Sequence, residues 1–220
     1  MNTQGFLDQL LKTAQQSVGD LTGGKGLGGD LGKGVLAGGA LGLLLGNSRA
    51  RKMGGKLAVY GGLAAVGALA YKAYGDWKQQ QSGTAAAAAP GTVDALPPPD
   101  AESHSQAILK ALIAASKADG HVDDRERQVI EGEFSRIDAA PEVRQWLQAE
   151  LQKPLDPAEV ARAATTPEMA SEMYLASLQA VDEQNFMERT YLDELARQLK
   201  LEDALKAKLE QQIKEAGDPV

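Results

Sequence analysis

The hydrophobic positions in the C-terminal half of the chain recur with the spacing of α-helices. From Asp100 onward, apolar side chains return every three or four residues, and no run alternates in the manner of a half-buried strand. The helical sets are Ile108–Ala115, Val129–Ile137, Val143–Leu151, Leu192–Leu199 and Leu205–Ile213. About 120 residues of this kind can enclose one hydrophobic core. We therefore predict that residues 100–220 form a compact all-α bundle.

Two capping signals add further helices to this bundle. Asp156 and Thr166 are residue types that cap helix N-termini, and each is followed by a proline, which suits the first position of a helix. These pairs predict a short helix near 157–164 and a longer one near 167–181.

The N-terminal half has a different pattern, with two apolar runs that are rich in glycine and alanine. The runs cover 35–45 and 57–71. A basic segment separates them: Arg49, Arg51, Lys52 and Lys56. Each run is shorter than the ~20 apolar residues of an ordinary membrane span, but neutral residues at the edges extend both. Glycine costs roughly 1 kcal/mol relative to alanine in a helix in water, so its abundance here requires a reason.

Small residues line one face of each run if the runs are helical. Such faces let helix backbones pack closely in lipid, where a helix satisfies its own backbone groups. We predict these membrane-packing positions: Gly34, Gly38, Gly42, Gly46, Gly61 and Gly62. Residues 32–78 would then form a hairpin of two short membrane helices, or one span near 56–74 after a partly inserted segment. A flexible glycine-rich linker with incidental apolar residues is the alternative.

Two flanking segments complete the predicted domain organisation. Residues 1–31 combine an amphipathic helix with a glycine-rich lead, and this helix either lies on the membrane surface or packs against protein. Residues 79–99 are a low-complexity Ala/Pro linker, which we expect to be a semi-rigid tether for the C-terminal domain.

Charge is divided unevenly between the two halves. Residues 1–99 carry nine basic and five acidic side chains, whereas residues 100–220 carry fourteen basic and twenty-five acidic ones. The acidic half argues against nucleic acid as a partner, because phosphates would be repelled. The basic segment between the apolar runs is typical of a cytoplasmic loop, which would place the C-terminal domain in the periplasm. The chain contains no cysteine, which excludes disulfides and thiolate metal sites.

A doubled acidic motif is the main candidate site. Two stretches share the same order of features: the end of a predicted helix, an aspartate, a capping residue and then Glu-Arg. They are "KADGHVDDRERQVI" and "AVDEQNFMERTYL". The caps and glutamates fit capping boxes, which is one interpretation. The other is a divalent metal site for calcium, magnesium, manganese or zinc, since oxygen ligands with one imidazole suit such ions. Its predicted ligands are Asp119, His121, Asp123, Glu126, Asp182 and Glu188.

These motifs resemble the TerB-like helical domain associated with tellurite resistance. With the glycine-rich region in front, the chain resembles the YebE-like family of bacterial inner-membrane proteins. The resemblance implies an all-α fold, an inner-membrane location, an uncharacterised role linked to envelope stress, and suspected divalent-metal binding at Asp119, Glu126, Asp182 and Glu188.

We therefore expect a non-enzymatic, membrane-anchored protein that senses or scaffolds. Its expected partners are membrane lipid, further copies of itself through the small-residue faces, and an unidentified protein. A glycine-zipper membrane oligomer is one alternative. A metal-dependent hydrolase is another, since paired carboxylates can perform acid–base chemistry, although no nucleophile–base pair is evident in the sequence.

Overall fold

The computed structural model describes residues 2–7, 63–82, 98–118, 140–181 and 186–217. The regular secondary structure in these ranges is helical throughout, which confirms the all-α fold class for this part of the chain. Residues 3–7 form a helical turn. The labelled helices are α5 (Leu63–Ser82), α6 (Pro98–Ala115), α8 (Pro141–Gln152), α9 (Pro157–Ala161), α10 (Pro167–Ala180), α11 (Phe186–Gln198) and α12 (Asp203–Gly217).

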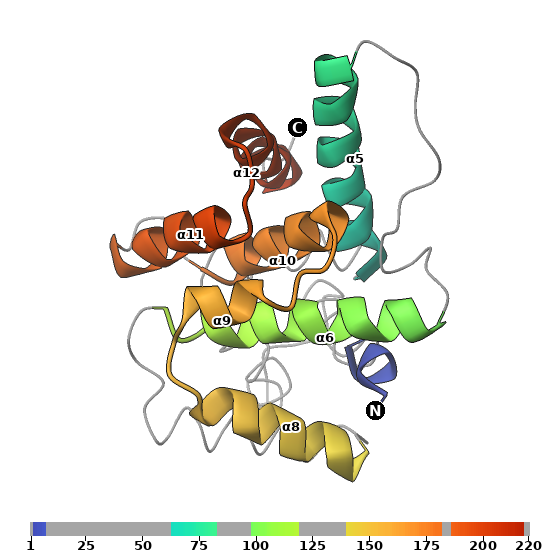
Figure 1. The fold of residues 1–220 in the computed structure, drawn as a ribbon, viewed down its shortest axis with the longest axis vertical. Helices are drawn as coiled ribbons and strands as arrows, with labels where there is room; N and C mark the ends of the chain where they lie inside the picture. Colours follow the sequence, from blue (N-terminus) through green and yellow to red (C-terminus); the bar gives the residue numbers. More distant parts are fainter. Residues whose placement is uncertain (1, 8–62, 83–97, 119–139, 182–185, 218–220) are drawn as a thin grey trace, which may run out of the picture.

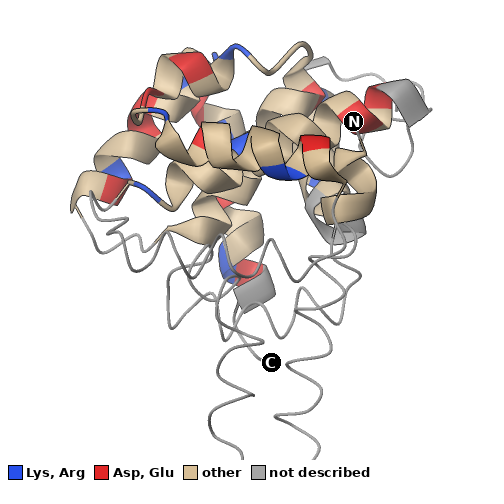
Figure 2. Ribbon diagram, turned by 90° about the horizontal axis from the view of Figure 1, so that it is seen from below, with Lys and Arg blue, Asp and Glu red and all other residues tan. Residues whose placement is uncertain are grey.

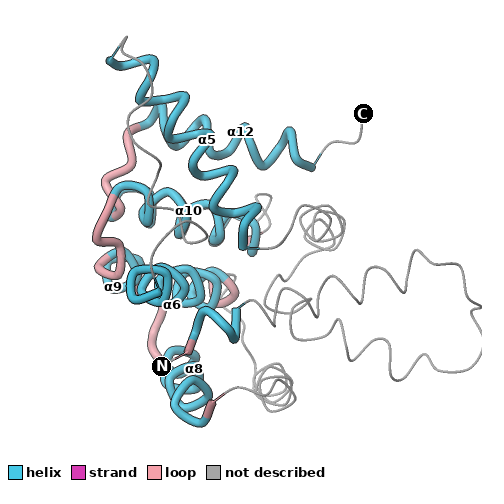
Figure 3. Tube along the Cα trace, turned by 90° about the vertical axis from the view of Figure 1, so that its right-hand side faces the viewer, coloured by secondary structure: helices cyan, strands magenta, loops and turns pink. Residues whose placement is uncertain are grey.

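The helices are arranged in layers around α6 and α10 (Figure 1). Helix α6 lies between α8 on one side and α9 with α10 on the other. Helices α5 and α12 pack against each other and against α10, on the side away from α6. Figure 3 shows the same sequence of layers from the side, running from α8 through α6 and α10 to the pair of α5 and α12.

Capping side chains start two of the helices where the sequence predicted them. The Asp156 carboxylate accepts hydrogen bonds from the amides of Ala158 at 2.9 Å and Glu159 at 3.3 Å. The Thr166 hydroxyl accepts one from the amide of Met169 at 3.1 Å. Because these bonds satisfy amides that have no partner within a helix, α9 and α10 begin at the prolines that follow the caps.

Helix α11 ends in a Schellman motif. Lys200 adopts a left-handed backbone with φ of 57°. The amide of Leu201 donates to the carbonyl of Ala196 at 3.0 Å, and the amide of Lys200 donates to that of Arg197 at 3.1 Å. This pair of bonds is the usual way to satisfy the last carbonyls of a helix, and it turns the chain from α11 into α12.

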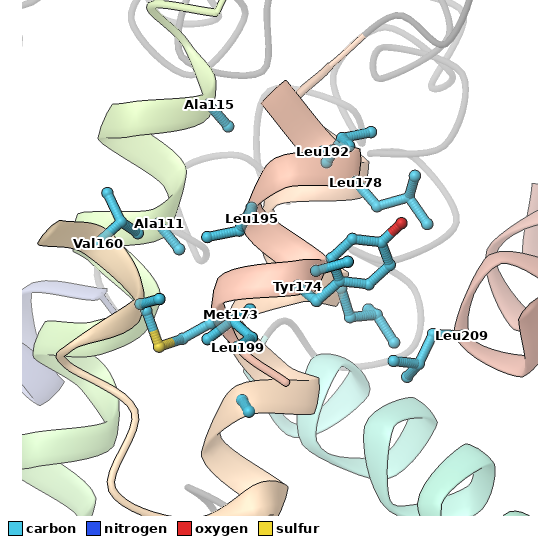
Figure 4. Packing of buried hydrophobic residues seen from close by; sticks show 14 of the residues in the cluster. Ala111, Ala115, Val160, Met173, Tyr174, Leu178, Leu192, Leu195, Leu199 and Leu209 are labelled. Carbon is cyan, nitrogen blue, oxygen red and sulfur yellow. The ribbon is translucent and has the colours of Figure 1, made fainter. Parts of the chain in front are cut away.

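The core is centred on α10, whose residues are buried along nearly its whole length. Met173, Tyr174 and Leu175 are each fully enclosed. Figure 4 shows Tyr174 among leucines from neighbouring helices, with Leu209 of α12 lying beside the ribbon of α5. A helix buried on all sides needs neighbours on all sides, and α5, α6, α11 and α12 all contact α10.

Helix α5 is part of this same core, although it precedes the predicted linker. Ala70 and Ala73 are buried in the hydrophobic cluster, and Leu69, Tyr74 and Trp77 pack against it. Residues 83–97 therefore connect two helices of one bundle. The predicted linker of 79–99 includes the helical residues 79–82 and 98–99.

Among the described residues, no helix combines the length and apolar character needed to cross a membrane. The six predicted membrane-packing glycines, at positions 34, 38, 42, 46, 61 and 62, lie outside the described residues.

Candidate functional site

The predicted metal ligands fall mostly outside the described residues. Those outside are Asp119, His121, Asp123, Glu126 and Asp182. Glu188 lies in the first turn of α11, where it is 8% exposed and has an interaction partner. Across the described ranges, no three His, Cys, Asp or Glu side chains come together as a metal site would require. The metal site stays a prediction.

A buried hydrogen bond between a histidine and a glutamate joins the two central helices. His104 on α6 and Glu172 on α10 are in contact, with Nδ1 and Oε2 2.6 Å apart. Their side chains are 5% and 0% exposed. Burying a polar group is costly unless it is hydrogen-bonded, and this contact satisfies a polar atom of each side chain. The arrangement has the groups needed for acid–base chemistry, but it is enclosed within the bundle.

The surroundings of this pair are apolar and tightly packed. Ala107, Ile108 and Ala111 lie one or two turns after His104 on α6, and all are buried. The Ser177 hydroxyl of α10 donates to the carbonyl of Ala111 at 3.4 Å. This bond joins a side chain of α10 directly to the backbone of α6.

No pattern in the sequence predicted a role for His104 or Glu172. A signal was present, because Glu172 lies three residues from both Met169 and Leu175, which are buried. A carboxylate on an apolar helix face needs a partner, but the sequence alone does not say which residue that partner is.

The N-terminal helical turn is bound by a carboxylate of α6. Glu102 accepts hydrogen bonds from the Thr3 amide at 2.8 Å, the Thr3 hydroxyl at 2.6 Å and the Gln4 amide at 3.1 Å. It thus caps the first helical turn from a distant part of the chain, a favourable place for negative charge. Phe6 and Leu7 of this turn are buried. At residues 3–7, the predicted amphipathic helix is therefore packed on protein.

These bonds shift the acidity of Glu102. Burial alone would raise its pKa, but the hydrogen bonds from Thr3 and Gln4, together with that from Gln106, outweigh burial and lower the pKa. The folded protein therefore favours the ionised carboxylate.

Lysines and glutamates connect α6 to α8 and α9. Lys110 contacts Glu159 at 2.6 Å, and Lys153 contacts Glu150 at 2.5 Å. Lys117 donates to the carbonyls of Glu150 at 3.0 Å and Lys153 at 2.9 Å, which satisfies the end of α8. Burial lowers the pKa of Lys117. These charges support the packing of the helices, and Figure 2 shows acidic and basic positions interspersed along the bundle.

The chain matches a known family over most of its length. The family model is that of a protein of unknown function, DUF533, and the match covers residues 30–213. The chain belongs to the DUF533 family. This family is related to TerB-like proteins, so the resemblance carried by the acidic turns is confirmed at that level. The match takes in both the glycine-rich region and the helical bundle.

The DUF533 chain is also similar to a protein of Yersinia enterocolitica, described as an uncharacterized protein in the ampR 5' region. The two are 34% identical over 110 residues, which is 50% of this chain and 79% of that protein. No solved structure matches the chain.

Proposed function

We propose that this DUF533 protein is a non-enzymatic, YebE-like module anchored in the bacterial inner membrane. The glycine-rich segment would form one or two membrane helices, and the helical bundle would face the periplasm. There the bundle would sense or scaffold, in contact with an unidentified protein, a divalent ion or both. The link to envelope stress remains an expectation from the family resemblance.

The observation that supports this proposal most is the continuity of α5. Residues 63–71 of the charge-free run of 57–71 belong to α5, and α5 enters the hydrophobic core at Ala70 and Ala73. We infer that the apolar character of the run serves two surroundings, protein and lipid. Protein surrounds the inner face from about residue 69 onward, and we assign the run upstream of that point to lipid, where small residues favour helix packing.

The enclosed His104–Glu172 pair supports a role other than catalysis. It is the buried acid–base pair of the described residues, and its side chains are 5% and 0% exposed. A general acid or base must come within hydrogen-bond reach of its substrate. Within the folded bundle, this pair can reach only protein, so its contribution is to structure.

Membrane fractionation of the full chain tests the proposal. The protein should remain in the membrane pellet after washing with alkaline carbonate and should float with liposomes. A matched variant that lacks residues 32–62 should move to the soluble fraction. Extraction of the full chain by carbonate would refute membrane anchoring. Reporter fusions at the C-terminus, one active only in the cytoplasm and one only in the periplasm, test the orientation separately.

The spacing of the glycines favours one further possibility, self-association in the membrane. The mass of the detergent-solubilised protein, compared with that of a variant carrying leucine at Gly38 and Gly42, would show whether the small-residue faces build an oligomer.

A further inference from the structure

Helix α5 is joined to the bundle by packing as well as by covalent connection. It contacts α10 and α12, which follow it by more than eighty residues in the chain. Its buried positions, Ala70 and Ala73, belong to the same hydrophobic cluster as Tyr174 and Leu209. Figure 4 shows Leu209 between α12 and α5. The bundle is therefore completed by a helix that comes from the anchor side of the 83–97 connection.

Two aromatic side chains of α5, Tyr74 and Trp77, pack against the hydrophobic cluster of the bundle and also contact each other within the helix. The rings of Tyr74 and Trp77 are 5.4 Å apart, and the Lys78 ammonium lies 5.6 Å from the centre of the Tyr74 ring. Burial raises the pKa of Tyr74, with an additional contribution from the charge of Glu168 on α10. The Tyr74 side of α5 thus faces α10.

The opposite face of α5 is exposed. Ala68, Tyr71 and Lys72 are exposed, and the Tyr71 side chain is 41% exposed. Tyrosine and lysine are typical of the boundary between lipid and water, where the ring lies among the headgroups and the ammonium reaches the aqueous side. They occur one turn after the point where we assign the chain to lipid.

We propose that the packing of α5 on α10 and α12, and not the 83–97 connection, holds the helical domain at the membrane. This inference depends on the proposed membrane anchor. The docked helix fixes the orientation of the domain, and its Tyr71–Lys72 face meets the bilayer headgroups. Residues 83–97 connect two packed helices, and the attachment of the domain to the membrane does not depend on this connection.

Cutting the connection in the full-length protein tests the inference. A site for a specific protease is placed within residues 83–97, and membranes containing the protein are cleaved and sedimented. Because α5 remains docked, we expect most of the fragment that begins near residue 98 to sediment with the membranes after complete cleavage. Release of that fragment at neutral pH without denaturant would overturn the inference.

Two variants of the cleavable protein make the result specific to the α5 interface. Ala73→Asp places an unpaired charge in the buried face and should release the cleaved fragment. Gln79→Asp places the same charge at an exposed position of α5 and should leave the fragment bound. Equal retention of both cleaved variants would count against α5 docking.

The uncleaved protein separates this inference from the anchor proposal. If uncleaved protein is already soluble, the anchor proposal fails. The docking is then judged by whether an N-terminal affinity tag still captures the C-terminal fragment after cleavage of a variant that lacks residues 1–7, because those residues also bind α6. If uncleaved protein sediments and the cleaved fragment is released, the anchor stands and the docking inference fails.

Discussion

Removing one member of the His104–Glu172 pair should destabilise the protein severely. The Nδ1–Oε2 distance is 2.6 Å, and the side chains are 5% and 0% exposed. Loss of either partner leaves the other enclosed without its counterpart, which typically costs about 3–5 kcal/mol. A domain of this size has a total stability of roughly 5–15 kcal/mol. His104→Leu or Glu172→Met alone should therefore remove a large part of the free energy of unfolding.

The double variant distinguishes loss of the pair from loss of packing. With both groups apolar, neither side of the His104–Glu172 contact is left unsatisfied, and such replacements are often close to neutral. We expect His104→Leu/Glu172→Met to be more stable than the sum of the single effects predicts, by about 2 kcal/mol or more, as for residues in direct contact. Glu172 has a further interaction, so the double variant should still be somewhat less stable than the parent.

Urea unfolding of the purified full chain measures these effects. Far-UV circular dichroism follows the helices, and the combined fluorescence of Trp77 and Trp146 reports on the packing of α5 and α8. The midpoint and the slope together give the free energy of unfolding. Arg197→Ala is the control, because the Arg197–Glu194 pair is exposed and should contribute little. Single variants that each cost less than about 1 kcal/mol, or a strictly additive double variant, would refute this account of the pair.

Three further predictions concern other parts of the chain. Folding lowers the pKa of Glu102 below its ordinary value of 4.5. The stabilising contribution of the ionised carboxylate is therefore present at neutral pH and is lost as the pH falls through the folded pKa. Glu102→Gln should reduce the free energy of unfolding at pH 7, and its difference from the parent should shrink in acid titrations of unfolding. Lys200→Gly should raise the free energy of unfolding measured in urea by about 0.5–1 kcal/mol, since the left-handed backbone suits glycine, whereas Ala207→Gly within α12 should lower it by about 1 kcal/mol. If the acidic turns bind metal, calcium, magnesium, manganese or zinc should raise the melting temperature of the full chain. Asp119→Ala and Asp182→Ala should abolish that rise. A melting temperature that none of the four ions changes would contradict the metal prediction.

Local signals in the sequence were sufficient to place most of the described helices. Asp156 and Thr166 act through bonds to amides two or three residues away, so the sequence contains everything needed to predict α9 and α10. The apolar spacing of α6, α8, α11 and α12 was equally informative, because each face is buried against neighbours at helical intervals.

Contacts between distant segments were not predictable in the same way. Glu102 binds Thr3 across 99 residues, and His104 binds Glu172 across 68. Threonine, histidine and glutamate also occur at many solvent-exposed positions, so the identity of one residue does not predict its distant partner. The docking of α5 was missed for a related reason: alanines such as Ala70 and Ala73 suit close helix packing in lipid and in a protein core alike, and periodicity does not distinguish the two surroundings.

Single-cysteine labelling along α5 is the most direct test of the claim that this helix belongs to the bundle. The chain has no cysteine of its own, so each substitution from position 72 to 79 can be probed with a maleimide in native membranes. Our account predicts helical periodicity, with cysteines at 73 and 77 protected and those at 72, 76 and 79 labelled. Labelling that rises steadily from 72 to 79, as for a helix that simply emerges from lipid into water, would contradict it.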